Sequence, residues 1–216
     1  MSSEPFCQPA ILCILRVMNV ERFPGIVDSD MSRNAILAQN PDSPAPQSVL
    51  YSLEVLNVEY IGFDGALHSG QIAVHNDIVQ DVTRFFATAL TMTFPIEKVI
   101  PISNKKYAWN DEVSCDDNNS SGYNYRLIAS TDRISKHAAG KAFDINPVQN
   151  IFVKYDADLR EIVRYPKDAV YDEQAPGTLT KEHPLVQLMK SLDWTWGGDW
   201  TPADGRVDYQ HFEKPR

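Results

Sequence analysis

The chain has 216 residues, of which 43% are hydrophobic and 23% are charged, a composition typical of a globular protein that buries a core. Its 29 acidic and 20 basic residues give a formal charge of -9, and no run rich in Lys and Arg is present to neutralise phosphates, which excludes a nucleic-acid partner. The three cysteines include no C-x-x-C pair, so neither a disulfide framework nor a cysteine zinc site is predicted.

The first 48 residues are predicted to form an arm that ends in a linker. Residues 10–18, AILCILRVM, are apolar, but nine residues interrupted by Arg16 are too few for a membrane span of roughly 20. The start of the chain also lacks the basic residues of a secretory signal. We interpret 10–18 as a short core strand or docking segment, with a degenerate or truncated export signal as the alternative. Residues 39–48, QNPDSPAPQS, predict an extended proline-rich linker, so the expected domains are an arm (1–48) and a main domain (49–216).

After the linker, the pattern predicts two strands and a helix. Residues 51–63, YSLEVLNVEYIGF, alternate β-branched and aromatic residues with polar ones and run into an Asp-Gly turn, and residues 66–75 read as the next strand. Apolar residues then recur at helical spacing from 76 to 93, and Phe94-Pro95 ends this amphipathic helix. Residues 96–102, IEKVIPI, follow as a predicted strand.

The second half of the chain is more irregular. Residues 102–124 are dense in Asn, Ser and Asp without a period, which predicts a long loop. Residues 157–166 favour a short strand or turn, and residues 180–192, TKEHPLVQLMKSL, a helix. Together the elements predict an α+β fold in which helices pack on a mainly antiparallel sheet.

Residues 135–147, SKHAAGKAFDINP, contain the first candidate for chemistry. If Gly140 and Lys141 form a two-residue turn, His137 and Asp144 become direct cross-strand neighbours, with Cβ atoms roughly 4.5 to 5.5 Å apart. These residues alone allow two interpretations, a structural hydrogen-bonded pair or two ligands of one metal ion.

A third ligand is available near the end of the chain, in VDYQHFEK (207–214). His137, Asp144 and His211 would give two histidines and one carboxylate. Such a set binds Zn²⁺ with a fourth position open for water, as catalytic sites do. Asp208 would then be the base that takes a proton from that water, and Glu213 could hydrogen-bond the other ring nitrogen of His211. The remaining histidines are expected to be surface or hydrogen-bonded residues: His68, His75 and His183.

The motifs resemble those of a known family. SKHAAGKAFDINP fits the pattern S-x-H-x-x-G-x-A-x-D, and WGGDW followed by DYQHFE fits the closing motif of the VanY-like zinc peptidases. This family includes D-alanyl-D-alanine carboxypeptidases and L-alanyl-D-glutamate endopeptidases. The resemblance runs from about residue 51 to residue 214 and implies the α+β fold of the LAS-type zinc peptidases, which are similar to hedgehog and D-Ala-D-Ala peptidase domains.

The resemblance also implies residue roles. One zinc ion would be held by His137, Asp144 and His211. Asp208 would be the general base, and the guanidinium of Arg126 would stabilise the oxyanion, unless it only pairs with a loop aspartate or a substrate carboxylate. Ser135 and Trp196 are the candidate substrate-binding residues. Cys115, in the polar loop, is a rival metal ligand, which the completeness of the three-ligand set disfavours.

The expected function is that of a hydrolase, a zinc metallopeptidase that cuts the peptidoglycan stem peptide. The NYR segment before the histidine motif and the DYQHFE ending favour an L-Ala/D-Glu endopeptidase. The alternatives are a D-Ala-D-Ala carboxypeptidase or dipeptidase and, more remotely, a non-catalytic cell-wall-binding relative. A mononuclear iron oxygenase also uses two histidines and a carboxylate, but its close H-x-D spacing differs from the H-x6-D spacing here. We expect a monomer without stable membrane insertion, acting outside the cytoplasm in the periplasm, in the cell wall or as a secreted protein.

Overall fold

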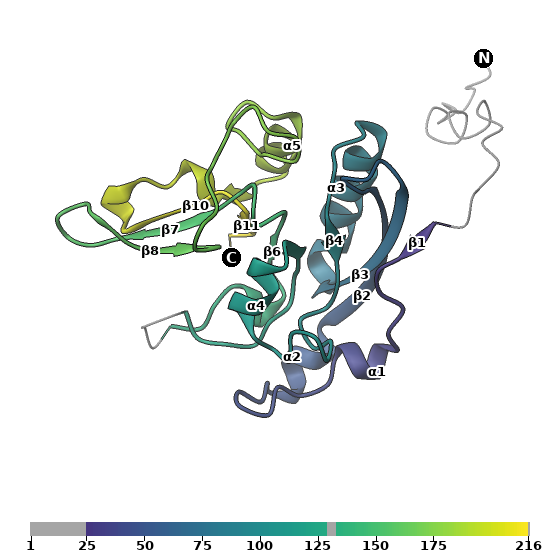
Figure 1. Ribbon diagram of the computed structural model, residues 1–216. Helices are drawn as coiled ribbons and strands as arrows, with labels where there is room; N and C mark the ends of the chain where they lie inside the picture. Colours follow the sequence, from purple (N-terminus) through teal and green to yellow (C-terminus); the bar gives the residue numbers. More distant parts are fainter. Residues whose placement is uncertain (1–24, 129–132, 216) are drawn as a thin grey trace, which may run out of the picture.

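The structure is a computed structural model that describes residues 25–128 and 133–215, so the predicted segment 10–18 lies outside the described residues. It is a mixed α+β fold, as predicted, but several small, mostly antiparallel sheets take the place of the one predicted sheet (Figure 1). Its helices are α1 (Arg33–Ile36), α2 (Gln47–Tyr51), η2 (Asn76–Ile78), α3 (Val79–Thr91), α4 (Asp111–Asp116), η3 (His137–Ala139), α5 (Pro184–Ser191), η4 (Gly197–Asp199) and η5 (Pro202–Asp204). Its strands are β1 (Ile26–Val27), β2 (Leu53–Ile61), β3 (Leu67–His75), β4 (Lys98–Val99), β5 (Asn119–Ser120), β6 (Ala142–Asp144), β7 (Phe152–Tyr155), β8 (Glu161–Tyr165), β9 (Thr195–Trp196), β10 (Arg206–Asp208) and β11 (His211–Glu213).

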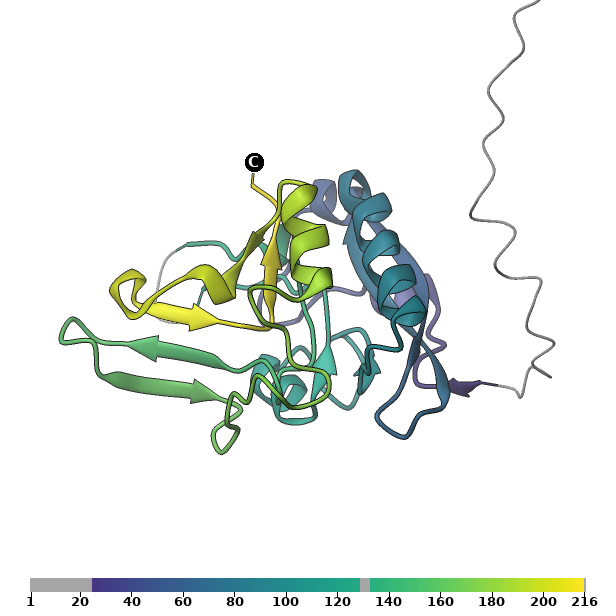
Figure 2. The ribbon, with the colours of Figure 1, turned by 90° about the horizontal axis from the view of Figure 1, so that it is seen from above.

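The longest strands form an antiparallel hairpin that the sequence predicts well. β2 and β3 pair from Leu53 opposite His75 to Ile61 opposite Leu67, and the predicted Asp-Gly turn joins them. The predicted helix begins as η2 and continues as α3, which packs on one face of this hairpin (Figures 1 and 2). Its buried side chains recur at helical spacing and enter the main core: Val82, Phe85, Phe86 and Ala89.

Part of the predicted arm packs against the other face of the hairpin. β1 pairs in parallel with β3, and Ile36 and Ala45 are buried in a second cluster with Leu53 and Tyr123. Residues 25–48 therefore contribute buried apolar surface, while the division of the chain at residue 48 stays a prediction.

A buried histidine links this first segment to the sheet. His68 Nδ1 lies 2.9 Å from Asp28 Oδ2, and His68 Nε2 lies 3.1 Å from Asp64 Oδ1. The hydroxyl of Tyr60 also donates to Asp28. Burial opposes protonation of His68, but the hydrogen bonds with the two aspartates outweigh it and raise the pKa of His68 above its usual value. As predicted, the other two histidines outside the motifs are hydrogen-bonded, since His75 and His183 accept from the backbone at helix starts.

Replacing Asp28 by Asn should lower the free energy of unfolding by about 1 to 2 kcal/mol at pH 6 and by less at pH 9. A raised folded-state pKa contributes stability that is present below the unfolded pKa of about 6.5 and is lost as the pH rises through the folded value. Denaturant unfolding at the two pH values measures the difference, with the exposed Asp64→Asn as the milder comparison. An equal loss at both pH values would assign the effect to packing instead of charge.

The predicted loop at 102–124 contains regular structure, which corrects that prediction. α4 lies within it, because the Asn110 side chain accepts from the backbone N–H of Val113 and caps the helix. β5 pairs in parallel with β4. The predicted strand 96–102 is shorter than expected, because only β4 within it is a strand. The polar residues that suggested a loop therefore act partly as caps and hydrogen-bonding partners, and they place α4 beside the centre described below.

The C-terminal half builds two further sheets, with strand orders β6-β11-β9 and β10-β7-β8. Residues 157–166 supply β8, which forms a hairpin with β7, and 180–192 supply α5, both as predicted. Phe143 of β6 stacks on Phe212 of β11, with ring centroids 5.2 Å apart, and both rings meet Phe85 of α3 edge to face. One hydrophobic core thus holds the β6 and β11 strands against the N-terminal layer.

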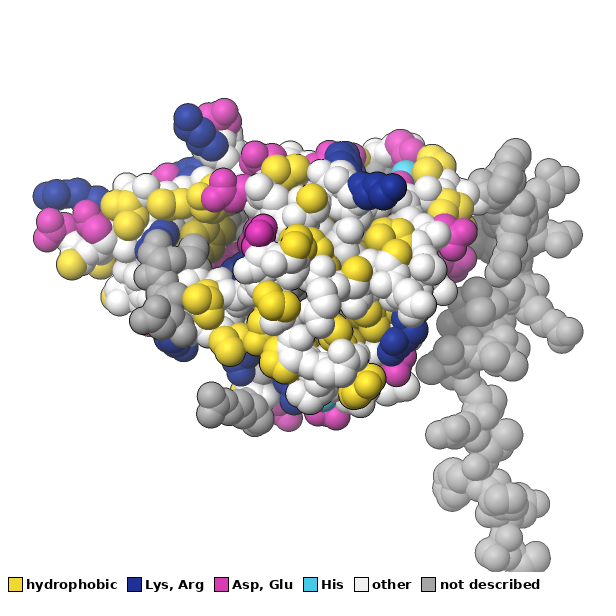
Figure 3. Space-filling model, turned by 90° about the horizontal axis from the view of Figure 1, so that it is seen from below, with side chains coloured by type: hydrophobic (Ala, Val, Ile, Leu, Met, Phe, Trp, Pro, Cys, Tyr) yellow, Lys and Arg dark blue, Asp and Glu magenta, His cyan; other side chains and the backbone are white. Residues whose placement is uncertain are grey.

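Among the residues that the structure describes, no helix is long and apolar enough to cross a membrane. On the face seen in Figure 3, hydrophobic side chains lie singly or in small groups, and charged side chains of both signs lie mostly near the margins. The described residues visible on this face form no continuous basic surface of the kind that binds polyanions.

Candidate metal centre

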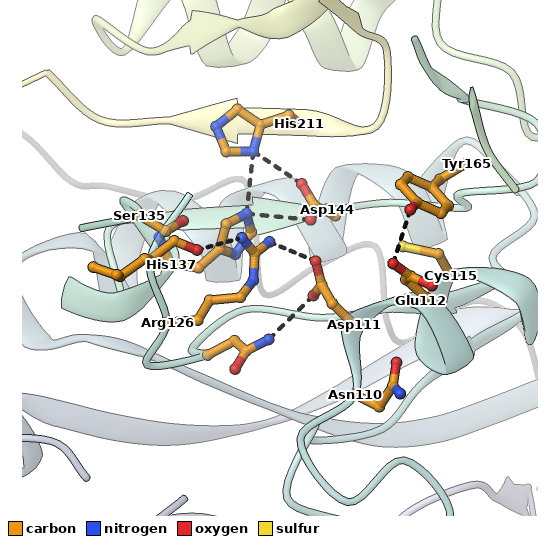
Figure 4. A network of polar contacts seen from close by, with 12 residues as sticks. Asn110, Asp111, Glu112, Cys115, Arg126, Ser135, His137, Asp144, Tyr165 and His211 are labelled. Atoms are coloured by element: carbon orange, nitrogen blue, oxygen red, sulfur yellow. Dashed lines mark hydrogen bonds and ion pairs between the residues drawn. The ribbon is translucent and has the colours of Figure 1, made fainter. Parts of the chain in front are cut away.

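The structure brings together the three predicted ligands, His137, Asp144 and His211, although 74 residues separate the histidines. His137 Nε2 lies 3.1 Å from His211 Nδ1 and 3.2 Å from Asp144 Oδ2. His211 Nδ1 lies 3.0 Å from Asp144 Oδ1. All three residues are buried, and their side chains converge on one point in Figure 4.

The local geometry differs from the predicted hairpin. Asp144 is the cross-strand partner of His211, in the antiparallel pairing of β6 with β11. His137 lies instead in the short helix η3, which Gly140 ends with a φ of +66°. A side chain at position 140 would be strained at this φ, and its Cβ would come within 2.5 Å of Leu53. Gly140 is therefore a helix cap packed against the hairpin, and the ligands meet through long-range strand pairing.

The hydrogen bonds of the two histidines leave one nitrogen of each ring for a metal ion. His137 Nδ1 lies 2.7 Å from the Gly122 carbonyl, which only accepts, so this nitrogen carries the proton and Nε2 keeps its lone pair. His211 Nε2 lies 3.2 Å from Glu213 Oε2, which confirms the predicted contact and directs His211 Nδ1 into the site. A hydrogen bond from the outer nitrogen to a carbonyl or carboxylate is the usual support of metal-binding histidines.

The donor atoms fit a small tetrahedral cation. Ligands about 2.0 to 2.2 Å from zinc in a tetrahedral site lie roughly 3.3 Å apart, close to the observed 3.0, 3.1 and 3.2 Å. Burial alone would raise the pKa of Asp144, yet the two imidazoles hold it well below its usual range. Burial likewise opposes protonation of His211, but its bonds to Asp144 and Glu213 raise its pKa to about 10. The centre favours positive charge strongly, as a cation site must.

Asp208 lies beside the ligands as a half-buried residue whose Oδ1 is buried. Burial is the main cause that raises the pKa of Asp208 to about 7, and the charge of Asp144 raises it further. The charges of His211 and Arg206 oppose this shift. Asp208 Oδ1 has no hydrogen-bond partner among the described residues. Gly197 permits this placement, because a Cβ there would come within 2.4 Å of the Asp208 carbonyl oxygen, which explains one glycine of WGGDW. A carboxyl with one buried oxygen that lacks a partner among the described residues, and with a pKa near neutrality, is suited to exchange a proton.

Arg126 belongs to a polar network next to His137 (Figure 4). Its Nη2 donates to Asp111 Oδ2 over 2.5 Å, and Asn124 Nδ2 donates to the other oxygen of Asp111 over 3.1 Å. The backbone N–H of Asn124 donates to the carbonyl of His137. Arg126 therefore pairs with an aspartate of the segment that was predicted as a loop, although Asp111 is the first residue of α4. Its Nε, buried and without a partner in the described part of the chain, is left for another acceptor.

The two predicted substrate-binding residues have different surroundings. Ser135 is buried, and its hydroxyl accepts from the backbone N–H of His137, so it supports the ligand helix; a contact with substrate stays a prediction. Trp196 is only 1% exposed and its indole N–H donates to the Tyr209 carbonyl, a core position that does not support the predicted substrate contact. Trp200 lies closer to the chemistry, with its ring 5.5 Å from that of His211.

Cys115 is not among the donors that converge. Its sulfur lies 3.9 Å from Gln210 Oε1, and burial raises the pKa of the thiol well above its usual value. A thiol held in its neutral form is a poor metal ligand, which agrees with the three-ligand prediction.

Sequence reasoning missed three residues near the centre: Asp111, Trp200 and Arg206. Asp111 directly follows the cap Asn110, so an Asn-Asp pair at the start of a capped helix was the available signal. Trp200 ends the motif WGGDW, in which spacing does not distinguish a core tryptophan from one beside the site, and no short-range pattern marks Arg206.

Two buried imidazoles and a carboxylate around one point, with a free carboxyl beside them, define a site of the kind that metallohydrolases use. In agreement, residues 129–214 match the family described as D-alanyl-D-alanine carboxypeptidase. This matched segment is less than half of the chain, and it contains all three donors and Asp208. No curated protein and no solved structure matches the chain.

Proposed function

We propose that the chain is a zinc-dependent D-Ala-D-Ala carboxypeptidase that removes the last D-alanine from the peptidoglycan stem peptide. The observation that carries the proposal is the buried cluster of His137, Asp144 and His211 inside the segment that matches the carboxypeptidase family. The proposal includes an LAS-type catalytic domain that begins near residue 49, a monomeric state and a site of action outside the cytoplasm, where the substrate lies. The family match thus favours the alternative of the sequence interpretation over its first choice.

The three donors would hold the zinc ion through His137 Nε2, His211 Nδ1 and a carboxylate oxygen of Asp144. A zinc ion bound there supplies a Lewis acid that lowers the pKa of a coordinated water to about 7. Asp208 accepts a proton at its unpartnered Oδ1 and, with its own pKa of about 7, can later return it to the leaving amine. Glu213 and the Gly122 carbonyl keep the two imidazoles in the tautomers that this arrangement needs.

Arg126 would stabilise the negative charge that develops on the carbonyl oxygen of the scissile bond. Asp111 fixes one end of its guanidinium, which reduces the reorganisation needed during the reaction. Because Asp111 already pairs with Arg126, we assign Arg126 to the transition state and not to capture of a free carboxylate in the ground state.

An L-Ala/D-Glu endopeptidase is the second candidate. The segment NNSSGYNYRLIAS before the histidine motif and the DYQHFE ending resemble the endopeptidase branch of the VanY-like family. The same three donors, with Asp208 and Arg126, would perform the hydrolysis. The two candidates differ in the bond that they present to the centre.

The products of sacculus digestion test the proposal. Purified sacculi and an acetylated L-Lys-D-Ala-D-Ala peptide are incubated with the chain, with and without a chelator, and the products are identified by mass spectrometry. We expect chelator-sensitive release of free D-alanine. New amino-terminal D-Glu without free D-alanine would instead support the endopeptidase, and the absence of any chelator-sensitive product would refute both.

A further inference from the structure

We infer that Arg206 and Lys154 form a carboxylate-binding subsite at the rim of the metal centre, which reads a free α-carboxylate on the residue that follows the scissile bond. The inference rests on the proposed function and adds to it the group of the substrate that is recognised.

The strand register places the two cations together. Arg206 of β10 is directly opposite Lys154 of β7 in an antiparallel pair, so both side chains lie on the same face, with Cβ atoms about 5 Å apart. Like charges directly opposite each other destabilise a sheet. Among the described residues neither cation forms an ion pair, although many other Lys and Arg side chains of this acidic chain do. An anion between the two would remove the repulsion.

Arg206 is on the same face of β10 as the carboxyl of Asp208. Side chains two residues apart on a strand point to the same side, so Arg206 and Asp208 share a face. The guanidinium of Arg206 lies over the ring of Trp200, 4.2 Å from its centroid, and the Trp200 ring lies 5.5 Å from that of His211. This cation–π contact holds the guanidinium near the metal ligands without using its hydrogen-bond donors on a carboxylate.

Both candidate substrates present a carboxylate at the matching distance along the chain. In D-Ala-D-Ala the residue after the scissile bond carries the terminal carboxylate. In the L-Ala/D-Glu bond that residue is D-Glu, whose α-carboxylate is free because the stem continues through its side chain. One residue spans about 3.8 Å, so a cation that reads this group must lie close to the scissile bond. Arg206 meets this need because it contacts Trp200, whose ring lies beside that of the metal ligand His211. The planar fork of arginine suits bidentate binding of a carboxylate.

Binding of matched acid and amide ligands tests the subsite independently of hydrolysis. Calorimetry on the zinc-loaded Asp208→Asn protein compares acetylated L-Lys-D-Ala-D-Ala with its C-terminal amide, and L-Ala-D-Glu with L-Ala-D-isoglutamine. We expect one acid to bind at least tenfold more tightly than its amide. This preference should fall to about onefold in Arg206→Gln, stay intermediate in Arg206→Lys and Lys154→Gln, and be unchanged in Lys181→Gln, which removes an exposed lysine outside the subsite.

The outcomes distinguish failure of the subsite from failure of the proposed peptidase activity. Equal binding of acid and amide in both pairs, or a preference that survives Arg206→Gln in a protein with unchanged zinc content and circular dichroism, would overturn the subsite. A preference that depends on Arg206, in a chain whose unsubstituted form hydrolyses neither peptide, would support the subsite and refute the proposed activity. The pair that shows the preference identifies which carboxylate is read.

Discussion

Replacing Asp208 by Asn should lower the rate of peptide hydrolysis by about 10²- to 10⁴-fold, the usual contribution of a positioned acid–base group, and leave metal binding unchanged. The side chain is not one of the three converging donors, so the zinc content should stay the same. The amide has nearly the same shape as the carboxyl and cannot accept the proton. Steady-state kinetics with the D-Ala-D-Ala peptide and atomic absorption of the dialysed protein measure the two effects.

The matched control is Asp168→Asn, an exposed aspartate on the loop after β8, for which we expect unchanged rates. The unfolding midpoint of the Asp208 variant should be equal to or higher than that of the unsubstituted chain, because the buried Oδ1 of Asp208 has no hydrogen-bond partner among the described residues and the carboxylate is therefore costly to keep charged. Full activity of Asp208→Asn would remove the carboxyl from the mechanism.

The sequence predicts local structure best where one period dominates. The alternation in 51–63 and the helical spacing in 76–93 correspond to β2 and to η2 with α3, because each segment buries one face of a regular element. Residues 102–124 were predicted as a loop because Asn and Asp favour turns and helix caps equally, and only tertiary packing selects α4.

The candidate site shows the same division between short-range and long-range information. The ligands follow from residue types in two motifs, yet their arrangement does not, since Asp144 pairs with His211 across strands and His137 approaches from η3. The position of Arg206 opposite Lys154 depends on the register of β10 against β7, which no local pattern specifies. The metal ligands could therefore be predicted from residue types and their spacing. The Arg206–Lys154 pair, to which we assign substrate specificity, could be found only from the fold.

Adding zinc to the chelator-treated chain should raise its free energy of unfolding by about 4 kcal/mol when free zinc is a thousandfold above the dissociation constant. The donors lie on η3, β6 and β11, and unfolding separates them, so the ion binds the folded state preferentially. Urea unfolding with zinc and with chelator measures the increment. His137→Gln should abolish it, because the amide does not replace the imidazole nitrogen that faces the other two donors.

Glu213→Gln is the informative comparison, since it weakens only the support of His211 Nε2. Loss of such an outer hydrogen bond typically costs 10- to 100-fold in metal affinity, so the zinc-dependent increment at a fixed zinc concentration should fall by about 1.4 to 2.7 kcal/mol without disappearing. Unfolding of each variant in chelator shows whether the substitution itself alters the fold. If zinc raised the free energy of unfolding of His137→Gln as much as that of the unsubstituted chain, the ion would bind elsewhere. The hydrolytic role assigned to Asp208, which depends on zinc at the three donors, would then be contradicted.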